Sequence, residues 1–166
     1  DGTFEFNGSV GFNQTSPLAK IHITDQDNAG WIFQEYNDAD GCNFRNYRAR
    51  GSIASPSAVL ADDRIAVFHA AGYTSAGAFS NILAGFAVHA EENFTSTAQG
   101  TYLKFTTSTT GTTTGQVERM RITGTGYVGI GVTPTVKLDV AGAGKFTGQI
   151  TSTLADGTSP FVLTSK

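Results

Sequence analysis

A short motif occurs twice in this chain, once toward each end. The first copy spans residues 8–23, with the sequence GSVGFNQTSPLAKIHI, and the second spans residues 126–140, with the sequence GYVGIGVTPTVKLDV. Each copy contains Gly-x-Val-Gly, then a turn with Thr or Ser and Pro, then a Lys and alternating aliphatic residues, and the second copy is one residue shorter. An internal repeat restricts the fold more strongly than overall composition does.

Within each copy, apolar residues alternate with glycine or polar residues. This period places the apolar side chains on one face of a strand, and glycines on the other face allow another backbone to come close. The proline ends the first strand and opens a turn before a second strand. We therefore expect each copy to be a hairpin-like module with one narrow apolar stripe. The seam residues predicted from the two copies are Val10, Gly11, Phe12, Ile21, Ile23, Val128, Gly129, Ile130, Gly131, Leu138 and Val140.

So narrow a stripe cannot form a core of its own. Identical neighbouring chains are the simplest cover for it. The residues after the second copy continue as short strands separated by Gly and Asp-Gly turns, so residues 124–166 read as a thin fibrous tail.

The segment between the copies predicts a different kind of structure. It holds the single Trp and most of the aromatic residues, in short alternating runs separated by polar turns. This pattern favours an antiparallel β-sandwich-like domain. Strands are expected at 31–36, 42–50, 64–71, 101–107 and 116–122, a strand or a short helix at 79–91, and a loop at 51–63. The predicted division is 1–23 (fibrous motif), 24–123 (compact all-β domain) and 124–166 (fibrous tail).

Composition excludes several classes of protein. The 20 Gly and 23 Thr residues make about a quarter of the 166 residues, which favours strands and turns over a helical bundle. With 15% charged residues and a net charge of -3, no nucleic-acid partner is expected.

The longest apolar run, residues 82–90, is too short for membrane insertion. One cysteine, Cys42, excludes an intrachain disulfide. The first residues carry no signal peptide or initiator Met, and we expect a piece of a longer protein.

Four segments in order resemble the tail fibres of tailed bacteriophages and prophages. They are RARGSIASP at 48–56, NFTSTAQGT at 93–101, VERMRI at 117–122 followed by GYVGIG at 126–131, and GTSPFVL at 157–163. The last resembles the stretch that leads toward an intramolecular chaperone in such fibres. The resemblance implies an intertwined homotrimer in the virion, outside the cell, attached to other tail proteins and contacting a host cell-surface receptor, with a glycan as the expected ligand.

Catalytic and metal-binding patterns are weak. The three histidines have no ligand spacing, although one His22 from each chain on a three-fold axis would give three ligands. Ile21 and Ile23 take the face opposite His22, so if the isoleucines face the axis, His22 does not. We expect no metal and no cofactor, while a metal on the three-fold axis remains an open alternative. Residues 25–28 and 38–41 are oxygen-rich turns without an EF-hand pattern. A glycosidase would need two carboxylates across a cleft, and we expect no enzyme. The candidate carboxylates are Glu35, Asp38, Asp40, Asp62, Asp63, Glu91 and Glu92.

Binding remains the functional class that the residues favour. Aromatic rings cover the apolar faces of sugars, while carboxylates and amides bind sugar hydroxyls. The residues predicted to bind a receptor glycan are Tyr36, Asp38, Asp40, Tyr47, Tyr73 and Phe79. Arginines 48, 50, 119 and 121 are expected to pair with carboxylates between chains. The alternatives are a purely structural fibre spacer, a bacterial trimeric adhesin module and a glycan-degrading tailspike fragment.

Overall fold

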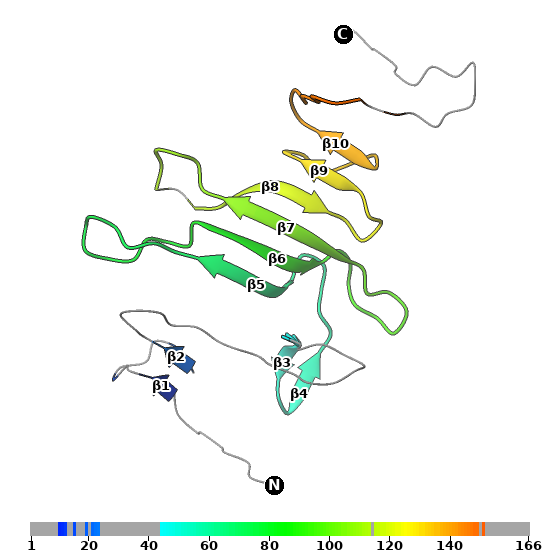
Figure 1. Cartoon of the computed structure of the whole chain (residues 1–166). Helices are drawn as coiled ribbons and strands as arrows, with labels where there is room; N and C mark the ends of the chain where they lie inside the picture. Colours follow the sequence, from blue (N-terminus) through cyan, green and yellow to red (C-terminus); the bar gives the residue numbers. More distant parts are fainter. Residues whose placement is uncertain are drawn as a thin grey trace, which may run out of the picture. The chain divides into compact units, whose positions relative to one another are not determined.

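The structure is a computed structural model that describes residues 10–12, 15, 19, 21–23, 44–113, 115–149 and 151. The chain divides into two compact units, residues 1–45 and residues 46–166. The described residues form ten strands and no helix (Figure 1). They accordingly include no helix able to cross a lipid bilayer. The predicted all-β class is confirmed.

A six-stranded sheet forms the centre of the second unit, in the order β10-β9-β8-β7-β6-β5 (Figure 1). Its strands are β5 (Arg64–Ala70), β6 (Ala84–Ala90), β7 (Thr101–Thr107), β8 (Val117–Ile122), β9 (Val128–Ile130) and β10 (Leu138–Val140). Neighbours in sequence are neighbours in the sheet, and all pairs except β9–β10 are antiparallel. The segment 79–91, predicted as a strand or a short helix, contains strand β6.

Two further strands, β3 (Arg50–Ser52) and β4 (Ser55–Ser57), form an antiparallel hairpin. The sequence interpretation placed a strand at 42–50 and a loop at 51–63. The described residues 44–49 have no regular structure, and the strand begins at Arg50. The hydroxyl of Ser52 accepts a hydrogen bond from the backbone N–H of Ser55 at 3.2 Å, which closes the two-residue turn.

The two motif copies form the same kind of strand pair. In the first copy β1 (Val10–Phe12) pairs with β2 (Ile21–Ile23), and in the second β9 pairs with β10. Both pairs are parallel, so the hairpin-like geometry expected from the sequence is wrong. Val10 pairs with Ile21, 11 positions later, and Val128 pairs with Leu138, 10 positions later. The residue missing from the second copy is therefore missing from the connection between the strands.

A connection of residues 131–137 is short for a parallel pair, which usually needs a dozen residues or more. It is possible here because the connection folds back onto β9. The carbonyl oxygen of Val132 and the ring of Pro134 occupy the space that a Cβ at Gly129 would need. The carboxylate of Asp139 accepts hydrogen bonds from the backbone N–H of Thr135 at 3.1 Å and from its hydroxyl at 3.0 Å. Glycine at 129 is thus required by close approach of the chain's own backbone.

The described strands of the second unit do not form the two layers of a sandwich. They form the six-stranded sheet, which is a single layer, and the separate two-stranded sheet of β3 and β4. The buried apolar residues are Val59, Ala87, Ala90 and Tyr102. The larger apolar side chains of the sheet line one side of this layer, and several of them, Phe68 and Phe86 among them, are exposed. The division at 123/124 falls between β8 and β9, which are paired neighbours, and the three-part division stays a prediction.

Candidate interaction surfaces

The first candidate surface is an apolar face that crosses all six strands of the large sheet. Residues directly opposite each other in paired strands project to the same face. The strand register therefore produces two aligned rows of apolar side chains. The first row, from β5 to β10, consists of Phe68, Phe86, Phe105, Met120, Ile130 and Val140. The second row consists of Ala66, Val88, Leu103, Ile122, Val128 and Leu138.

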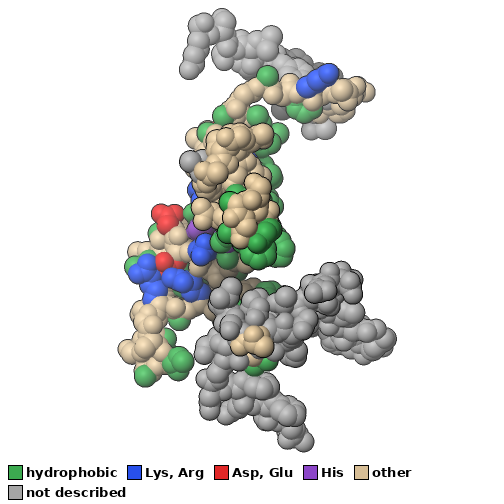
Figure 2. All heavy atoms as spheres, turned by 90° about the vertical axis from the view of Figure 1, so that its left-hand side faces the viewer, with side chains coloured by type: hydrophobic (Ala, Val, Ile, Leu, Met, Phe, Trp, Pro, Cys, Tyr) green, Lys and Arg blue, Asp and Glu red, His purple; other side chains and the backbone are tan. Residues whose placement is uncertain are grey.

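This apolar face is open to solvent in a single chain. Phe68 is 62% exposed, Phe86 46% and Leu138 56%, and none of the side chains in the two rows is buried. The rings of Phe68 and Phe86 stack with centroids 5.6 Å apart. Figure 2 shows hydrophobic side chains gathered on one side of the sheet and charged side chains on the other. Contiguous exposed apolar surfaces of this kind mark interaction sites.

Most of the seam residues predicted from the second motif copy fall in this face. Four of them form one edge of the two rows, namely Val128, Ile130, Leu138 and Val140. Gly129 faces the opposite side of the sheet, where it is paired with Asp139 and Arg121, and Gly131 begins the connection. In the first copy the paired residues are Val10 with Ile21, Gly11 with His22 and Phe12 with Ile23.

Sequence reasoning missed the larger part of this face, which β5 to β8 contribute. The alternation within 84–90 and 101–107 indicated two-sided strands, but it did not give the register between them. Only the register shows that three phenylalanines, Phe68, Phe86 and Phe105, stand side by side.

The opposite face of the sheet is polar and pairs its charges within the chain. The Arg121 guanidinium donates to both carboxylate oxygens of Glu118, at 2.7 and 2.9 Å. Lys104 Nζ lies 3.5 Å from the same carboxylate. Hydrogen bonding and the charge of Arg121 lower the pKa of Glu118. The guanidinium also lies 4.3 Å from the ring centroid of Tyr102, and burial raises the pKa of that phenol.

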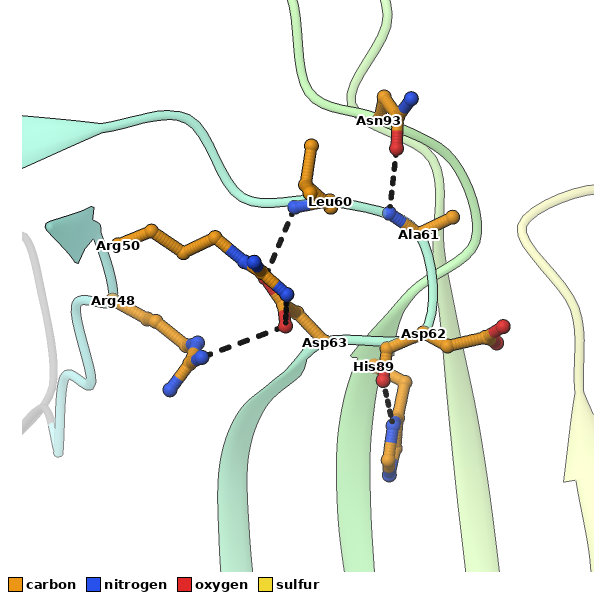
Figure 3. A network of polar contacts seen from close by, with 8 residues as sticks. All are labelled: Arg48, Arg50, Leu60, Ala61, Asp62, Asp63, His89 and Asn93. Atoms are coloured by element: carbon orange, nitrogen blue, oxygen red, sulfur yellow. Dashed lines mark hydrogen bonds and ion pairs between the residues drawn. The ribbon is translucent and has the colours of Figure 1, made fainter.

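A second ionic cluster holds the segment before β5 (Figure 3). Arg50 donates to both carboxylate oxygens of Asp63, at 2.5 and 2.8 Å, and Arg48 lies 3.5 Å away. The backbone N–H of Leu60 donates to the same carboxylate at 3.0 Å. The Asp63 side chain is only 10% exposed. The hydrogen bonds from Arg50 and Leu60 hold the pKa of Asp63 well below its usual range.

The four arginines at 48, 50, 119 and 121 were expected to pair with carboxylates between chains. In the structure each of them binds a side chain of its own chain. Arg48 and Arg50 contact Asp63, and Arg121 contacts Glu118. The remaining one, Arg119, donates to threonine hydroxyls at 2.9 and 3.0 Å. The pairing of β7 with β8 brings the Thr107 hydroxyl within reach of Arg119, whereas Arg121 meets Glu118 three residues earlier in its own strand.

Two of the predicted glycan-binding residues meet at the loop end of the sheet. Tyr73 and Phe79 form an isolated β-bridge, and their rings pack edge to face with centroids 5.3 Å apart. They are 68% and 76% exposed. Phe79 lines a cleft of about 380 Å³ between the β5–β6 and β7–β8 loops. The polar residues of this cleft are Thr74, Ser80, Asn81, Thr112 and Thr113.

The other predicted glycan-binding residues are not placed at this cleft. Tyr47 is 87% exposed in the segment before β3 and does not line it. Tyr36, Asp38 and Asp40 lie outside the described residues. The threonines and Asn81 were missed, because hydroxyl and amide side chains in turns carry no sequence signal of their own.

Most of the described carboxylates that were considered for catalysis make bonds that hold the fold. Glu91 accepts a hydrogen bond from the backbone N–H of Gly124 at 2.7 Å, and Glu92 accepts one from Gly100 at 2.6 Å. Asp62 accepts a long one, 3.3 Å, from the hydroxyl of Tyr102. Among the residues that the structure describes, no group of three or more His, Cys, Asp or Glu could hold a metal ion.

Comparison with known proteins gives a structural likeness. The chain is similar to the carboxy-terminal domain of the bacteriophage T5 L-shaped tail fibre, with a TM-score of 0.50 and 17% sequence identity. The fold resembles a phage tail-fibre domain. The likeness covers 61% of this chain and 36% of that chain, so this chain matches about a third of the length of that structure. No family model matches the sequence, and no curated protein matches it.

Proposed function

We propose that the chain is a segment of a bacteriophage tail fibre that assembles as a homotrimer through its apolar face. The single observation that carries this proposal is the pair of aligned apolar rows, which cross the whole sheet and are uncovered in one chain. Three copies around a three-fold axis would each turn this face inward. Removing apolar surface from water stabilises an assembly by about 25 cal/mol per Å². The fold likeness to a tail-fibre domain supports this reading.

This proposal places the chain in the virion, outside the host cell, joined to other tail proteins. The measurement that tests it is the absolute mass in solution, by light scattering on a sizing column. A homotrimer has three times the mass of one 17.4 kDa chain. A folded species with the mass of one chain contradicts the assembly and with it the role of the apolar face.

We further propose that the loop-end cleft binds a host-surface glycan. The exposed Phe79 ring offers an apolar platform, and the surrounding hydroxyls and Asn81 offer hydrogen bonds to sugar hydroxyls. A glycan array with the wild-type chain and with Phe79→Ala tests this role, and Phe146→Ala, another exposed phenylalanine, is the control. Loss of binding in Phe79→Ala alone supports the cleft. A trimer that binds no glycan supports the alternative of a structural spacer.

We propose a binding protein and not an enzyme. The observation that supports this is the engagement of Asp63, Glu91 and Glu92 in bonds that hold the fold. A glycosidase needs two carboxyl groups that face each other across a cleft, and these three carboxylates are directed instead at groups of their own fold. Release of reducing sugar from a bound glycan contradicts this part of the proposal and favours a tailspike-like enzyme.

A further inference from the structure

The polar face of the sheet contains a hollow of about 140 Å³. The hollow forms because β6, which lies between β5 and β7, presents the small residues Gly85 and Ala87 on this face. The side chains that β5 and β7 present beside them are longer. A Cβ at Gly85 would collide with the ring of His69 and the carbonyl of Phe68. Glycine at 85 therefore allows the His69 ring to lie against the sheet at the side of the hollow.

The side chains around the hollow are cationic or neutral, with no carboxylate among them. Arg64 and Lys104 line it, together with His69 and His89. Arg64 makes no ion pair with a described residue, and Lys104 lies 3.5 Å from Glu118, which Arg121 holds more closely at 2.7 Å. The site therefore has an excess of positive charge.

A buried donor without a partner also lines the hollow. The side-chain nitrogen of Gln116 is buried and has no hydrogen-bond partner among the described residues. Leaving a buried N–H unpaired costs stability, so such a group usually indicates a missing acceptor. In a cationic hollow, the acceptor that fits both observations is an oxyanion.

His89 adds a second histidine ring to the lining of the hollow. Its Nδ1 lies 3.1 Å from the backbone carbonyl of Asp62, which can only accept, so Nδ1 carries the hydrogen (Figure 3). The other ring nitrogen, Nε2, is then an acceptor in the neutral ring and becomes a donor when the ring is protonated.

We propose that this hollow binds a small oxyanion, either the carboxylate of an acidic sugar or a phosphate group. The volume suits one such group, and Arg64, Lys104 and Gln116 supply donors on different sides of it. The site goes beyond the proposed trimer and does not rest on it. Its residues come from one chain, on the face opposite the apolar rows.

The test is a calorimetric titration of the full chain at low ionic strength with three probes: inorganic phosphate, glucuronate and glucose. Binding of phosphate alone, of glucuronate alone or of both supports the site and names its oxyanion. Binding of neither, or equal binding of glucose, overturns it. A glucuronate titration at falling pH should show tighter binding, since this carboxylate stays ionised while His69 gains charge. The titratable and charged groups that face these histidines include Arg64, Lys104 and, beyond Lys104, Glu118. Tyr102 stacks on the His89 ring, and Asp62 binds His89 through its backbone carbonyl and Tyr102 through its carboxylate.

Two variants and one control locate the site. Gln116→Glu keeps the size of the side chain and places a negative charge where the donor was, and Arg64→Gln removes a cation from the rim. We expect each to weaken binding about tenfold or more, as loss of one charge-assisted hydrogen bond does. Lys145→Gln removes the same charge from an exposed position away from the hollow and should change binding less than twofold. If Lys145→Gln weakens binding as much as Arg64→Gln does, binding follows net charge and the site is wrong. Should Gln116→Glu fail to fold, Arg64→Gln decides.

Discussion

The two faces of the six-stranded sheet are made by the same strands, yet one chain satisfies only one of them. On the polar face, Glu118 is held by Arg121 and Lys104, and the Tyr102 ring lies under a guanidinium. On the apolar face, Phe68 and Phe86 contact each other and remain exposed. Charged side chains reach partners within a single layer. Apolar side chains are stabilised by removal from water, and a single layer cannot provide that.

The two faces therefore suit different functions. The polar face is complete except at its cationic hollow, so it suits contact with solvent and ligands. The apolar face is incomplete along its whole width, so it suits contact with copies of the same chain. A substitution on one face should therefore leave the other face intact. Substitutions in the connection after β9 or in the ionic cluster before β5 should affect the stability of the sheet as a whole.

The largest effect is expected from adjacent residues of β7 that project to opposite faces. Phe105→Gln places an amide in the centre of the first apolar row, between Phe86 and Met120. Truncating or replacing a buried phenylalanine costs about 3–5 kcal/mol, and a trimer carries the change three times. We expect assembly to be lost, as measured by light scattering. Lys104→Gln, one residue earlier on the polar face, is the matched control and should keep the wild-type mass. A Phe105→Gln chain that assembles normally would show that the apolar row is not the seam.

A smaller effect is expected where the motif connection folds onto the sheet. Gly129→Ala inserts a Cβ into space held by Val132 and Pro134, and overpacking of this kind costs about 1–3 kcal/mol. Urea unfolding should show that loss, and hydrogen exchange should rise in residues 128–140. Gly148→Ala, where a Cβ would meet nothing within 4 Å, is the control. Equal stability of the two variants would mean that the connection moves aside at little cost.

The ionic cluster before β5 should make a pH-dependent contribution to stability. The pKa of Asp63 is lowered in the folded chain, so its contribution is present above the unfolded value of about 3.9 and is lost as the pH falls below it. We expect Asp63→Asn to lower the melting temperature at pH 7 and to reduce the further loss on acidification. Asp62→Asn is the neighbouring control. Asp62 makes no ion pair with a residue that the structure describes, and asparagine tolerates its φ of 65°. If Asp63→Asn melts at the wild-type temperature, the ionic cluster does not contribute to the stability of the fold.

Within the six-stranded sheet, the positions of β7 and β8 and the two faces of β7 could be predicted well from the sequence. Alternation in 101–107 and 116–122 marked β7 and β8 almost to the residue. It also separated Leu103 and Phe105 from Tyr102 and Lys104, which lie on opposite faces in the structure. These features are local, and side-chain period alone determines them.

The parallel pairing of the motif strands and the sheet-wide apolar rows could not be predicted. Both depend on contacts between residues far apart in the sequence. The Pro and Gly residues indicated a turn, but they did not show that the connection packs back over Gly129 and returns the chain in the same direction. The cationic hollow was missed for the same reason, since Arg64, Lys104 and Gln116 share no spacing in the sequence.

The smallest effect is expected at the cationic hollow on the polar face. Burial and the charge of Arg64 lower the pKa of His69. The unfolded chain, with an ordinary value of about 6.5, therefore binds more protons than the folded chain as the pH falls below neutrality, and stability decreases. The change should be small because solvent screens a partly exposed ring. An NMR titration of His69 measures it directly. Arg64→Gln should move the His69 pKa upward, and a His69 that titrates above the ordinary histidine value in the wild-type chain would contradict the excess of positive charge on which the oxyanion site depends.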